Sequence, residues 1–300
     1  MATAYRGMQC APYASAQDIR DLVSIKANII RYQITAGPNE FLNTTPPEYT
    51  AWVLDHLNHL DLTVIPALEG KAKIIIDLHT PPYGMTGSWH NIFLSRPEGQ
   101  DLITDIWKYI ANRYKTNVAV YAFDLLNEPA GSAPKVKAFM TRTVHAIRTV
   151  DITRRLLISC PRSNPSNFSK TAYQYGDKYC QYVLHMYSPM KFTHQGVNGY
   201  DTGVKYPTSR YNKEWMLKTL EPVFYFQKKN RARINMNEFS VSSFADDASR
   251  TAYIRDVLSI AQKQGWQWCY HAWREHPVWS AEDCPPVFSV LKRHFKKNRR

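Results

Sequence analysis

The sequence predicts a single α/β domain folded as a (β/α)8 barrel of the TIM-barrel type. Apolar strand-like runs alternate with helix-like runs along the chain, and this alternation predicts parallel β–α units. Eight strand-like runs fall within 300 residues, an ordinary size for one such barrel. An open doubly wound sheet is the alternative, and it is disfavoured because no glycine-rich phosphate loop follows the first strand-like run.

The individual elements follow from short apolar runs and from helical spacing. The predicted strands are residues 5–9, 28–34, 73–79, 119–127, 156–160, 181–187, 233–238 and 266–273. Helical patterns cover 15–26, 102–110, 136–147, 213–229, 246–264 and 285–296. A capping box at Thr45 and Glu48, with proline at the first helical position, begins a further helix. The segment 161–178 is polar and loop-like, so the helix after the fifth strand has the weakest pattern.

Composition narrows the class of protein. Hydrophobic residues make up 44% and charged residues 21%, close to a globular average. The net charge of +13 is scattered except in a short basic C-terminal tail, Lys292 to Arg300, and no nucleic-acid-binding motif accompanies it. We expect a solvated tail on one domain covering residues 1–300, with no nucleic-acid partner. The five cysteines form no CxxC pair, so neither a metal nor another cofactor is predicted, and no apolar run is long enough to span a membrane.

Two glutamates stand directly after strand-like runs, in Asn127-Glu128-Pro129 and in Asn237-Glu238-Phe239. Barrel enzymes carry their active sites at the carboxyl ends of the strands. Two carboxylates meeting there are what hydrolysis of a glycosidic bond requires, because one protonates the leaving oxygen and the other attacks the sugar or activates water. Polar or aromatic groups stand at or near the ends of other predicted strands as well: Arg31, His79, His185 with Tyr187, and Trp273.

This ordered set resembles glycoside hydrolase family 5, the cellulase-type (β/α)8 enzymes, over nearly the whole chain. The residues that carry the resemblance are Arg31, His79, Asn127, Glu128, His185, Tyr187, Glu238 and Trp273. One departure is Asn237, because the family often has glycine before the second glutamate. The stretches 77–82, 192–196 and 270–275 also resemble a bacterial branch of cellulase-like proteins within the family, a branch without a settled substrate.

The resemblance implies a retaining mechanism in which Glu128 is the acid/base and Glu238 the nucleophile. It also implies supporting roles for neighbouring residues: Arg31 and Tyr187 orient Glu238, Asn127 binds the sugar 2-hydroxyl, and His79 and His185 bind sugar or orient the carboxylates. Trp273 would form the floor of the subsite where the bond breaks, with core packing as the alternative. Candidates for outer subsites are Trp89, Glu275 and Trp279. For each of them, a structural or surface role is an equal alternative.

The expected function is therefore cleavage of a β-1,4-linked glucan, as in an endoglucanase or cellulase. Alternatives are another β-glycan, such as mannan, xyloglucan or mixed-linkage glucan, or short glycosides. A non-catalytic carbohydrate-binding barrel is the alternative from a different class, and a polyanion-binding protein is suggested only by the charge. We expect a monomer with a polysaccharide or oligosaccharide substrate. The family that the chain resembles is mostly secreted, whereas this chain shows no signal peptide. The expected location is therefore secreted or periplasmic with the signal trimmed, and a cytoplasmic location stays open.

Overall fold

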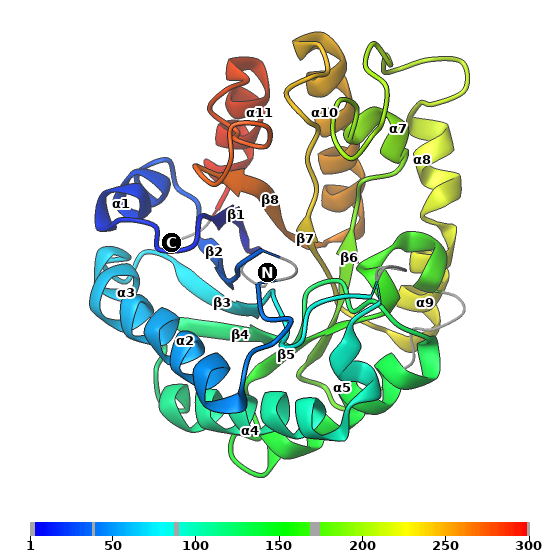
Figure 1. Ribbon diagram of the computed structural model, residues 1–300. Helices are drawn as coiled ribbons and strands as arrows, with labels where there is room; N and C mark the ends of the chain where they lie inside the picture. Colours follow the sequence, from blue (N-terminus) through cyan, green and yellow to red (C-terminus); the bar gives the residue numbers. More distant parts are fainter. Residues whose placement is uncertain (1–3, 38–39, 87–89, 169–174, 299–300) are drawn as a thin grey trace.

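The computed structural model describes residues 4–37, 40–86, 90–168 and 175–298. Its centre is a closed barrel of eight parallel strands arranged in chain order, with β8 paired to β1 (Figure 1). The strands are β1 (Arg6–Cys10), β2 (Ile29–Ile34), β3 (Lys73–Leu78), β4 (Val120–Asp124), β5 (Arg155–Ser159), β6 (Cys180–His185), β7 (Ile234–Glu238) and β8 (Gln267–Trp273). The predicted (β/α)8 barrel is confirmed, and β4 ends three residues earlier than predicted.

Helices surround the barrel on its outside (Figure 1). They are α1 (Ala16–Ser24), α2 (Pro46–His59), α3 (Ile65–Ala67), α4 (Pro97–Tyr114), α5 (Ala133–Arg148), α7 (Met190–Thr193), α8 (Lys213–Thr219), α9 (Glu221–Asn230), α10 (Asp247–Gln264) and α11 (Pro285–Phe295). The predicted capping box of α2 is present, because the Glu48 carboxylate accepts a hydrogen bond from the Thr45 backbone N–H while the Thr45 hydroxyl accepts one from the Glu48 N–H.

The helix predicted over 213–229 is instead two helices. α8 ends at Thr219 and α9 begins at Glu221, with Leu220 between them at φ −89° and ψ −3°. Pro222 explains the break, because a proline has no backbone N–H to continue the helix and its ring clashes with the carbonyl one turn earlier. The amphipathic pattern alone does not reveal this break, since the same face is buried on both sides of it.

Two other predicted segments differ in detail. The segment after β5 holds two short 3-10 helices, Pro161–Ser163 and Pro165–Asn167, as its polar sequence indicated. The basic tail is only partly a free end, because Lys292–Phe295 is the last turn of α11 and Phe295 is fully buried. Beyond the helix, the Asn298 side chain donates hydrogen bonds to the backbone carbonyls of Arg6 and Lys26.

Two apolar layers hold the barrel together. The larger lies between the strands and the helices, and the smaller fills the barrel itself with side chains from alternate positions of several strands. The inner layer consists of Ile29, Ile75, Tyr121, Ala122, Leu157, Val183 and Cys269, with Tyr5 packed against it. Side chains nearer the carboxyl ends of the strands lie above this plug, which therefore supports the polar groups of the site. Within the described residues, no helix is both long and apolar enough to cross a bilayer.

Gly7 allows β1 to approach β2 at the bottom of the barrel. A Cβ added at this position would overlap the backbone carbonyl of Ile29, which no side-chain rotation can relieve. We expect Gly7→Ala to lower the free energy of unfolding by about 3 kcal/mol or more. Urea unfolding followed by circular dichroism measures the change.

Gly37→Ala is the matched control, because the nearest atom to its added Cβ is a Glu40 carboxylate oxygen 3.8 Å away. This control should change the free energy of unfolding by less than about 0.5 kcal/mol. Equal stability of the Gly7 and Gly37 variants would contradict the packing argument.

Candidate active site

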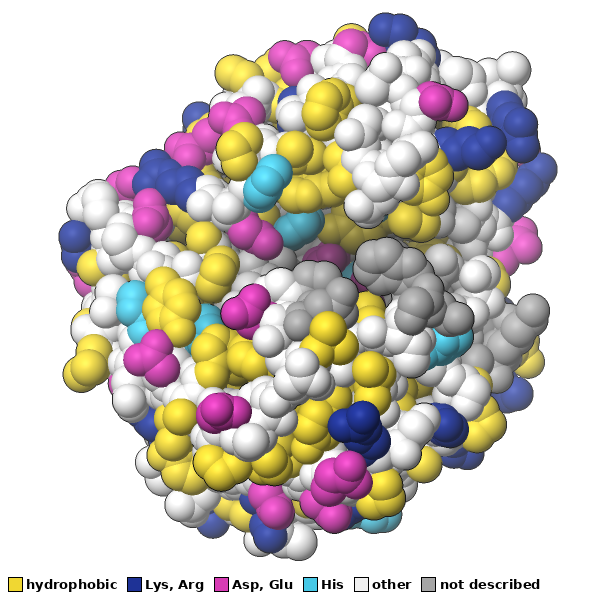
Figure 2. All heavy atoms as spheres, in the orientation of Figure 1, with side chains coloured by type: hydrophobic (Ala, Val, Ile, Leu, Met, Phe, Trp, Pro, Cys, Tyr) yellow, Lys and Arg dark blue, Asp and Glu magenta, His cyan; other side chains and the backbone are white. Residues whose placement is uncertain are grey.

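Glu128 and Glu238 meet at the carboxyl end of the barrel. Glu238 is the last residue of β7, and Glu128 lies in the loop that follows β4. One carboxylate oxygen of each glutamate and one ring nitrogen of His185 all lie within 4.8 Å of one another. In the orientation of Figure 1, the face of the molecule is hollowed near its middle, with acidic and histidine side chains in and beside the hollow (Figure 2). The two glutamates predicted from sequence are therefore neighbours.

The two carboxylates have unequal surroundings. The side chain of Glu238 is 7% exposed, whereas that of Glu128 is 38% exposed. Glu128 has a φ of 37°, in the left-handed region that residues other than glycine seldom adopt. Backbone of this kind is concentrated at functional sites. One glutamate is thus fixed inside the barrel, and the other reaches over it from a sharp turn.

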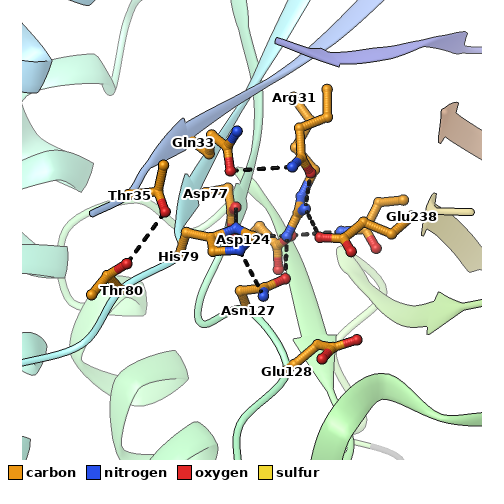
Figure 3. A network of polar contacts seen from close by, with 12 residues as sticks. Arg31, Gln33, Thr35, Asp77, His79, Thr80, Asp124, Asn127, Glu128 and Glu238 are labelled. Carbon is orange, nitrogen blue, oxygen red and sulfur yellow. Dashed lines mark hydrogen bonds and ion pairs between the residues drawn. The ribbon is translucent and has the colours of Figure 1, made fainter. Parts of the chain in front are cut away.

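Arg31 of β2 is the central cation of the site (Figure 3). Its side chain is completely buried and donates to Glu238 Oε1, to Asn127 Oδ1 at 2.9 Å and to Asp124 Oδ2 at 2.9 Å. Its Nη2 also lies 3.0 Å from Asp77 Oδ1. Because Gln9 Oε1 of β1 also accepts from Arg31 Nη1, one guanidinium contacts three carboxylates and two side-chain amides from four other strands or their loops. Asp77 and Asp124 hold this cation in place.

Burial and charge act in opposite directions on the carboxylates around Arg31. Burial raises the pKa of Asp124 to about 6, although the Arg31 cation opposes the rise. Burial also acts to raise the pKa of Glu238, but His185, Arg31 and His271 outweigh it, so the net pKa of Glu238 lies far below its ordinary value. Glu238 is therefore an anion at neutral pH, as a nucleophile must be.

His185 at the end of β6 connects the two glutamates. Its Nδ1 lies 2.7 Å from Glu128 Oε1 and 3.5 Å from Glu238 Oε2. Burial acts to lower the pKa of His185, yet the two carboxylates outweigh it and the net pKa is raised. This imidazole is accordingly suited to donate a hydrogen bond to Glu128.

His79 and Asn127 form a second connection to the same centre. His79 Nδ1 contacts Asp77 Oδ2 at 2.8 Å, and its Nε2 lies 3.0 Å from Asn127 Nδ2. Asn127 in turn accepts from Arg31 and is fixed through its backbone N–H, which donates to the Leu78 carbonyl. Through Arg31 and Asp77, both residues are thus connected to Glu238.

Tyr187 follows β6 and contacts the oxygen of Glu238 that Arg31 does not. The Tyr187 hydroxyl donates to Glu238 Oε2 at 3.1 Å and lies 2.9 Å from His271 Nδ1. His271 Nε2 lies 3.2 Å from Glu275 Oε2. Glu275, proposed from sequence for an outer subsite, is therefore connected to Glu238 through two residues, His271 and Tyr187.

The structure places Trp273 in the core between barrel and helices, the alternative that the sequence left open. Its indole is 2% exposed, stacks on Phe288 of α11 and donates to the Asp18 carbonyl. The reason is an extra residue in β8, since Met8 pairs with Tyr270 but Cys10 pairs with Trp273. A bulge of this kind reverses which face of the sheet the following side chains occupy. A strict two-residue alternation would have put Trp273 on the same side as His271.

Trp279 lies beside three rings at the carboxyl end of the barrel. Its ring centre is 5.2 Å from that of His194, 5.6 Å from His271 and 6.4 Å from Tyr187. Its carbonyl accepts from the Ala272 N–H, which fixes the loop to the end of β8. The other candidate for an outer subsite, Trp89, lies outside the described residues.

One group among the described residues is close enough to hold a metal ion, namely Glu128, His185 and Glu238. Two carboxylates and an imidazole are acceptable ligands for several divalent ions. However, Arg31 and Tyr187 already donate to the two oxygens of Glu238, and His185 points Nδ1 at Glu128. A metal would have to displace these hydrogen bonds, so we assign the group to acid–base chemistry.

The sequence reasoning missed several residues of the network. Gln9, Gln33, His194 and His271 all contact members of it. The two glutamines stand near the ends of predicted strands, and the two histidines lie in the stretches 192–196 and 270–275 already compared with the family. Gln9 and Gln33 stand at the ends of the first two predicted strands, in the same place as Arg31 and His79. His271 lies two residues before Trp273 in a stretch already singled out. The bulge in β8 is the reason why the two side chains lie on different faces of the sheet.

A closed parallel barrel with two neighbouring glutamates at the carboxyl ends of its strands is the arrangement of a glycoside hydrolase. The family model for Cellulase (glycosyl hydrolase family 5) matches residues 2–277. The chain therefore belongs to glycosyl hydrolase family 5, as the resemblance implied, and it is a glycoside hydrolase.

Individual relatives and structures agree with this assignment. Endoglucanase C of Acetivibrio thermocellus is 27% identical over 240 residues, which cover 70% of this chain and 70% of that protein. A hyperthermophilic endo-β-1,4-glucanase, solved in complex with substrate, has a TM-score of 0.78 at 20% identity and covers 97% of both chains. An endoglucanase from Thermotoga maritima has a TM-score of 0.76 at 20% identity, covering 95% of this chain and 96% of that one. At such identities the two structures establish the shared fold.

Arg31→Met would leave buried carboxylates without their common cation. Breaking a buried ion pair in this way typically costs about 3–5 kcal/mol, and we expect a loss in that range in the free energy of unfolding at pH 7. Urea unfolding measures it. Arg113→Met is the control, because Arg113 pairs with Asp61 at the surface and such pairs contribute about 1 kcal/mol or less. Equal losses in the two variants would contradict the central role of Arg31.

Proposed function

We propose that this protein hydrolyses β-1,4-linked glucan with retention of anomeric configuration, using Glu238 as nucleophile and Glu128 as acid/base. The observation that carries the mechanism is the spacing of the two carboxylates, whose nearest oxygens lie within 4.8 Å. Retaining glycosidases hold their carboxyl groups about 5–5.5 Å apart, whereas inverting ones leave about 6.5–9.5 Å for a water molecule. The spacing therefore supports direct attack on the sugar.

In the first step, the ionised Glu238 attacks the anomeric carbon and the bond to the leaving oxygen breaks. Arg31 and Tyr187 hold the two carboxylate oxygens, so the nucleophile is aimed before substrate arrives. Glu128 gives its proton to the leaving oxygen. His185 Nδ1 lies 2.7 Å from Glu128 Oε1; with the imidazole as donor there, the transferable proton would be carried on Oε2.

In the second step, Glu128 has lost its proton and acts as a base. It takes a proton from a water molecule, whose oxygen attacks the anomeric carbon and releases Glu238 as a carboxylate. Because Glu128 is the more exposed of the two glutamates, water and the departing sugar have access to it. Asn127, fixed by Arg31 and His79, is in place to bind the 2-hydroxyl of the reacting sugar.

The substrate class is supported by the relatives rather than by the catalytic residues, since one scaffold hosts many specificities through its loops. Endoglucanase C, a relative by sequence, covers 70% of this chain. Structures of the Thermotoga maritima enzyme are described with cellobiose and with mannotriose. A mannan or another β-glycan is thus the second candidate substrate for this chain. We also propose that the protein acts as a monomer outside the cytoplasm, where such polymers occur.

Trp279 is proposed as the aromatic platform of the subsite next to the scissile bond, in place of Trp273. Its position beside Tyr187, His194 and His271 leaves it half-buried at the wall of the site. Indole rings bind the apolar faces of sugars because they offer a large, rigid surface at low entropic cost. This platform would bind sugar without taking part in proton transfer.

Glu238→Gln should abolish turnover while leaving the fold intact, because the amide cannot attack the anomeric carbon. We expect a loss on the order of 10⁴-fold or more in kcat. The measurement is release of reducing sugar from carboxymethylcellulose, barley β-glucan, xyloglucan, mannan and xylan. Proton NMR of the first product formed by the unmodified enzyme would report its anomeric configuration.

Glu282→Gln is the control, since Glu282 pairs with Arg274 in an exposed position. Activity on one glucan that this control retains and the Glu238 variant lacks would support the assignment. An initial product of inverted configuration, or full activity of the Glu238 variant, would overturn it.

Trp279→Ala should weaken substrate binding more than it slows chemistry. Aromatic contacts of this type contribute about 0.5–1.5 kcal/mol beyond area burial, so KM should rise by roughly 2- to 13-fold with a smaller change in kcat. Trp215→Ala, on the outer helix α8, should leave KM unchanged. Steady-state kinetics on a soluble cello-oligosaccharide provides the comparison. An unchanged KM for the Trp279 variant would remove this residue from the proposed subsite.

A further inference from the structure

A closed ring of hydrogen bonds runs from the nucleophile through five other side chains and back. Its members, in order, are Glu238, Tyr187, His271, Glu275, Gln9 and Arg31. We infer that His271 and Glu275 are a positioning pair that fixes the direction in which the Tyr187 hydroxyl donates, and thereby switches one hydrogen bond to the nucleophile on or off. This inference rests on the proposed function of Glu238.

The distances define the two arms of the ring. On one arm, Tyr187 Oη lies 3.1 Å from Glu238 Oε2 and 2.9 Å from His271 Nδ1, and His271 Nε2 lies 3.2 Å from Glu275 Oε2. On the other arm, Gln9 Nε2 donates to the same Glu275 oxygen at 3.3 Å, and Gln9 Oε1 accepts from Arg31 Nη1. Glu275 is thus fixed from two sides and oriented toward His271.

Counting protons shows why the charge of His271 matters. A tyrosine hydroxyl has a single proton to donate. When that proton points to Glu238, the contact between Tyr187 and His271 needs a proton on Nδ1, while the ionised Glu275 needs one on Nε2. The observed contacts are therefore all satisfied together only by the doubly protonated, positively charged imidazole.

The neutral imidazole gives a different arrangement with the same atoms. Glu275 keeps the proton on Nε2, so Nδ1 presents a lone pair to Tyr187. The Tyr187 hydroxyl then has two competing acceptors, Nδ1 and the Glu238 carboxylate. Donation to Nδ1 leaves Glu238 Oε2 without this hydrogen bond, so that of the two donors Arg31 and Tyr187 only Arg31 still holds the nucleophile. Loss of one proton from His271 thus removes a hydrogen bond to Glu238, which His271 reaches only through Tyr187.

The surroundings of His271 favour the charged form. Burial acts to lower the pKa of His271, and the Arg31 cation does the same, but Glu275 and Glu238 outweigh them and the net pKa is raised. Glu275 in turn has its pKa lowered to about 2, because His271 outweighs the effect of burial. The titratable or charged groups that face His271 are Glu275 after β8, Glu238 of β7, Arg31 of β2, Tyr187 after β6 and His194 after α7.

The sign of the pH effect follows from these charges. Because the pKa of His271 is raised, the charged form and the Tyr187 bond to Glu238 persist through the ordinary titration range of histidine, near 6.5. They are lost as the pH rises through the raised pKa. We therefore expect the rate of glycosyl-enzyme formation to fall on the alkaline side for a reason separate from the proton that Glu128 gives to the leaving oxygen.

A substrate with an activated leaving group isolates this effect. Departure of 2,4-dinitrophenolate from 2,4-dinitrophenyl β-cellobioside needs no proton, so kcat/KM for this substrate does not require protonated Glu128. An alkaline decline that remains in the unmodified enzyme then reports His271. We expect Glu275→Gln to move this decline to lower pH by about 1–3 units, the usual effect of removing an opposite charge.

Two further variants separate positioning from general damage. Glu282→Gln removes a carboxylate from the same loop, where it pairs with Arg274, and should leave the decline in place. His271→Asn keeps a side-chain N–H at the position of Nδ1 but cannot titrate, so its kcat/KM should show no such decline. His271→Ala should lose activity at every pH. A structural role alone would lower activity in the last two variants without changing the shape of either profile.

A second readout does not depend on activity. NMR of histidine-labelled protein should show His271 titrating above about 6.5, with both ring nitrogens protonated at lower pH, and titrating at lower pH in Glu275→Gln than in Glu282→Gln. A neutral His271 at pH 6, or equal titration in those two variants, would overturn the inference. If no glycoside is hydrolysed, the proposed function fails, and this NMR comparison still decides whether the pair exists. An alkaline decline that the Glu275 and His271 variants leave unchanged would overturn the inference while the proposed function stands.

Discussion

The buried contact between Arg31 and the carboxylates around it is the constraint on which the site depends. Burying three carboxylates in one place is strongly unfavourable unless a cation compensates them. The guanidinium does so with a planar, branched set of donors that reaches Asp77, Asp124 and Glu238 at once. A lysine could not satisfy these directions together. The apolar plug of the barrel beneath, and the helices outside, exclude the water that would otherwise weaken this arrangement.

The two glutamates differ because their supports differ. Glu238 lies on a strand and is held at both oxygens, by Arg31 and Tyr187, so its charge and direction are set by rigid parts of the barrel. Glu128 lies on a turn with a left-handed backbone, contacts His185 and is more exposed. A nucleophile needs a fixed position, whereas an acid/base needs access to water and to the leaving group. The fold supplies each requirement with a different kind of element.

Much of this could be predicted from sequence because barrels put strand ends in one place. Seven predicted site residues stand within or just after a recognisable apolar run, and the structure brings them together. They are Arg31, His79, Asn127, Glu128, His185, Tyr187 and Glu238. Trp273 could not be placed in the same way, because the extra residue in β8 changes which side its indole faces. The contacts of His271 and Gln9 with the site could not be predicted for a related reason. Their partners lie on other strands or in other loops, and spacing within one strand does not reveal them.

The loop after β8 carries both Glu275 and Trp279, and the backbone of Ala272 fixes it twice, donating to the Trp279 carbonyl and accepting from the Ala281 N–H. One short stretch of chain therefore holds both the carboxylate proposed to act on Glu238 through His271 and the ring proposed to bind the substrate. Exchanging this loop between related enzymes would transfer glycan preference and the acidity range of catalysis as one inherited unit. A change in this loop that altered glycan preference would then also alter the pH range of catalysis.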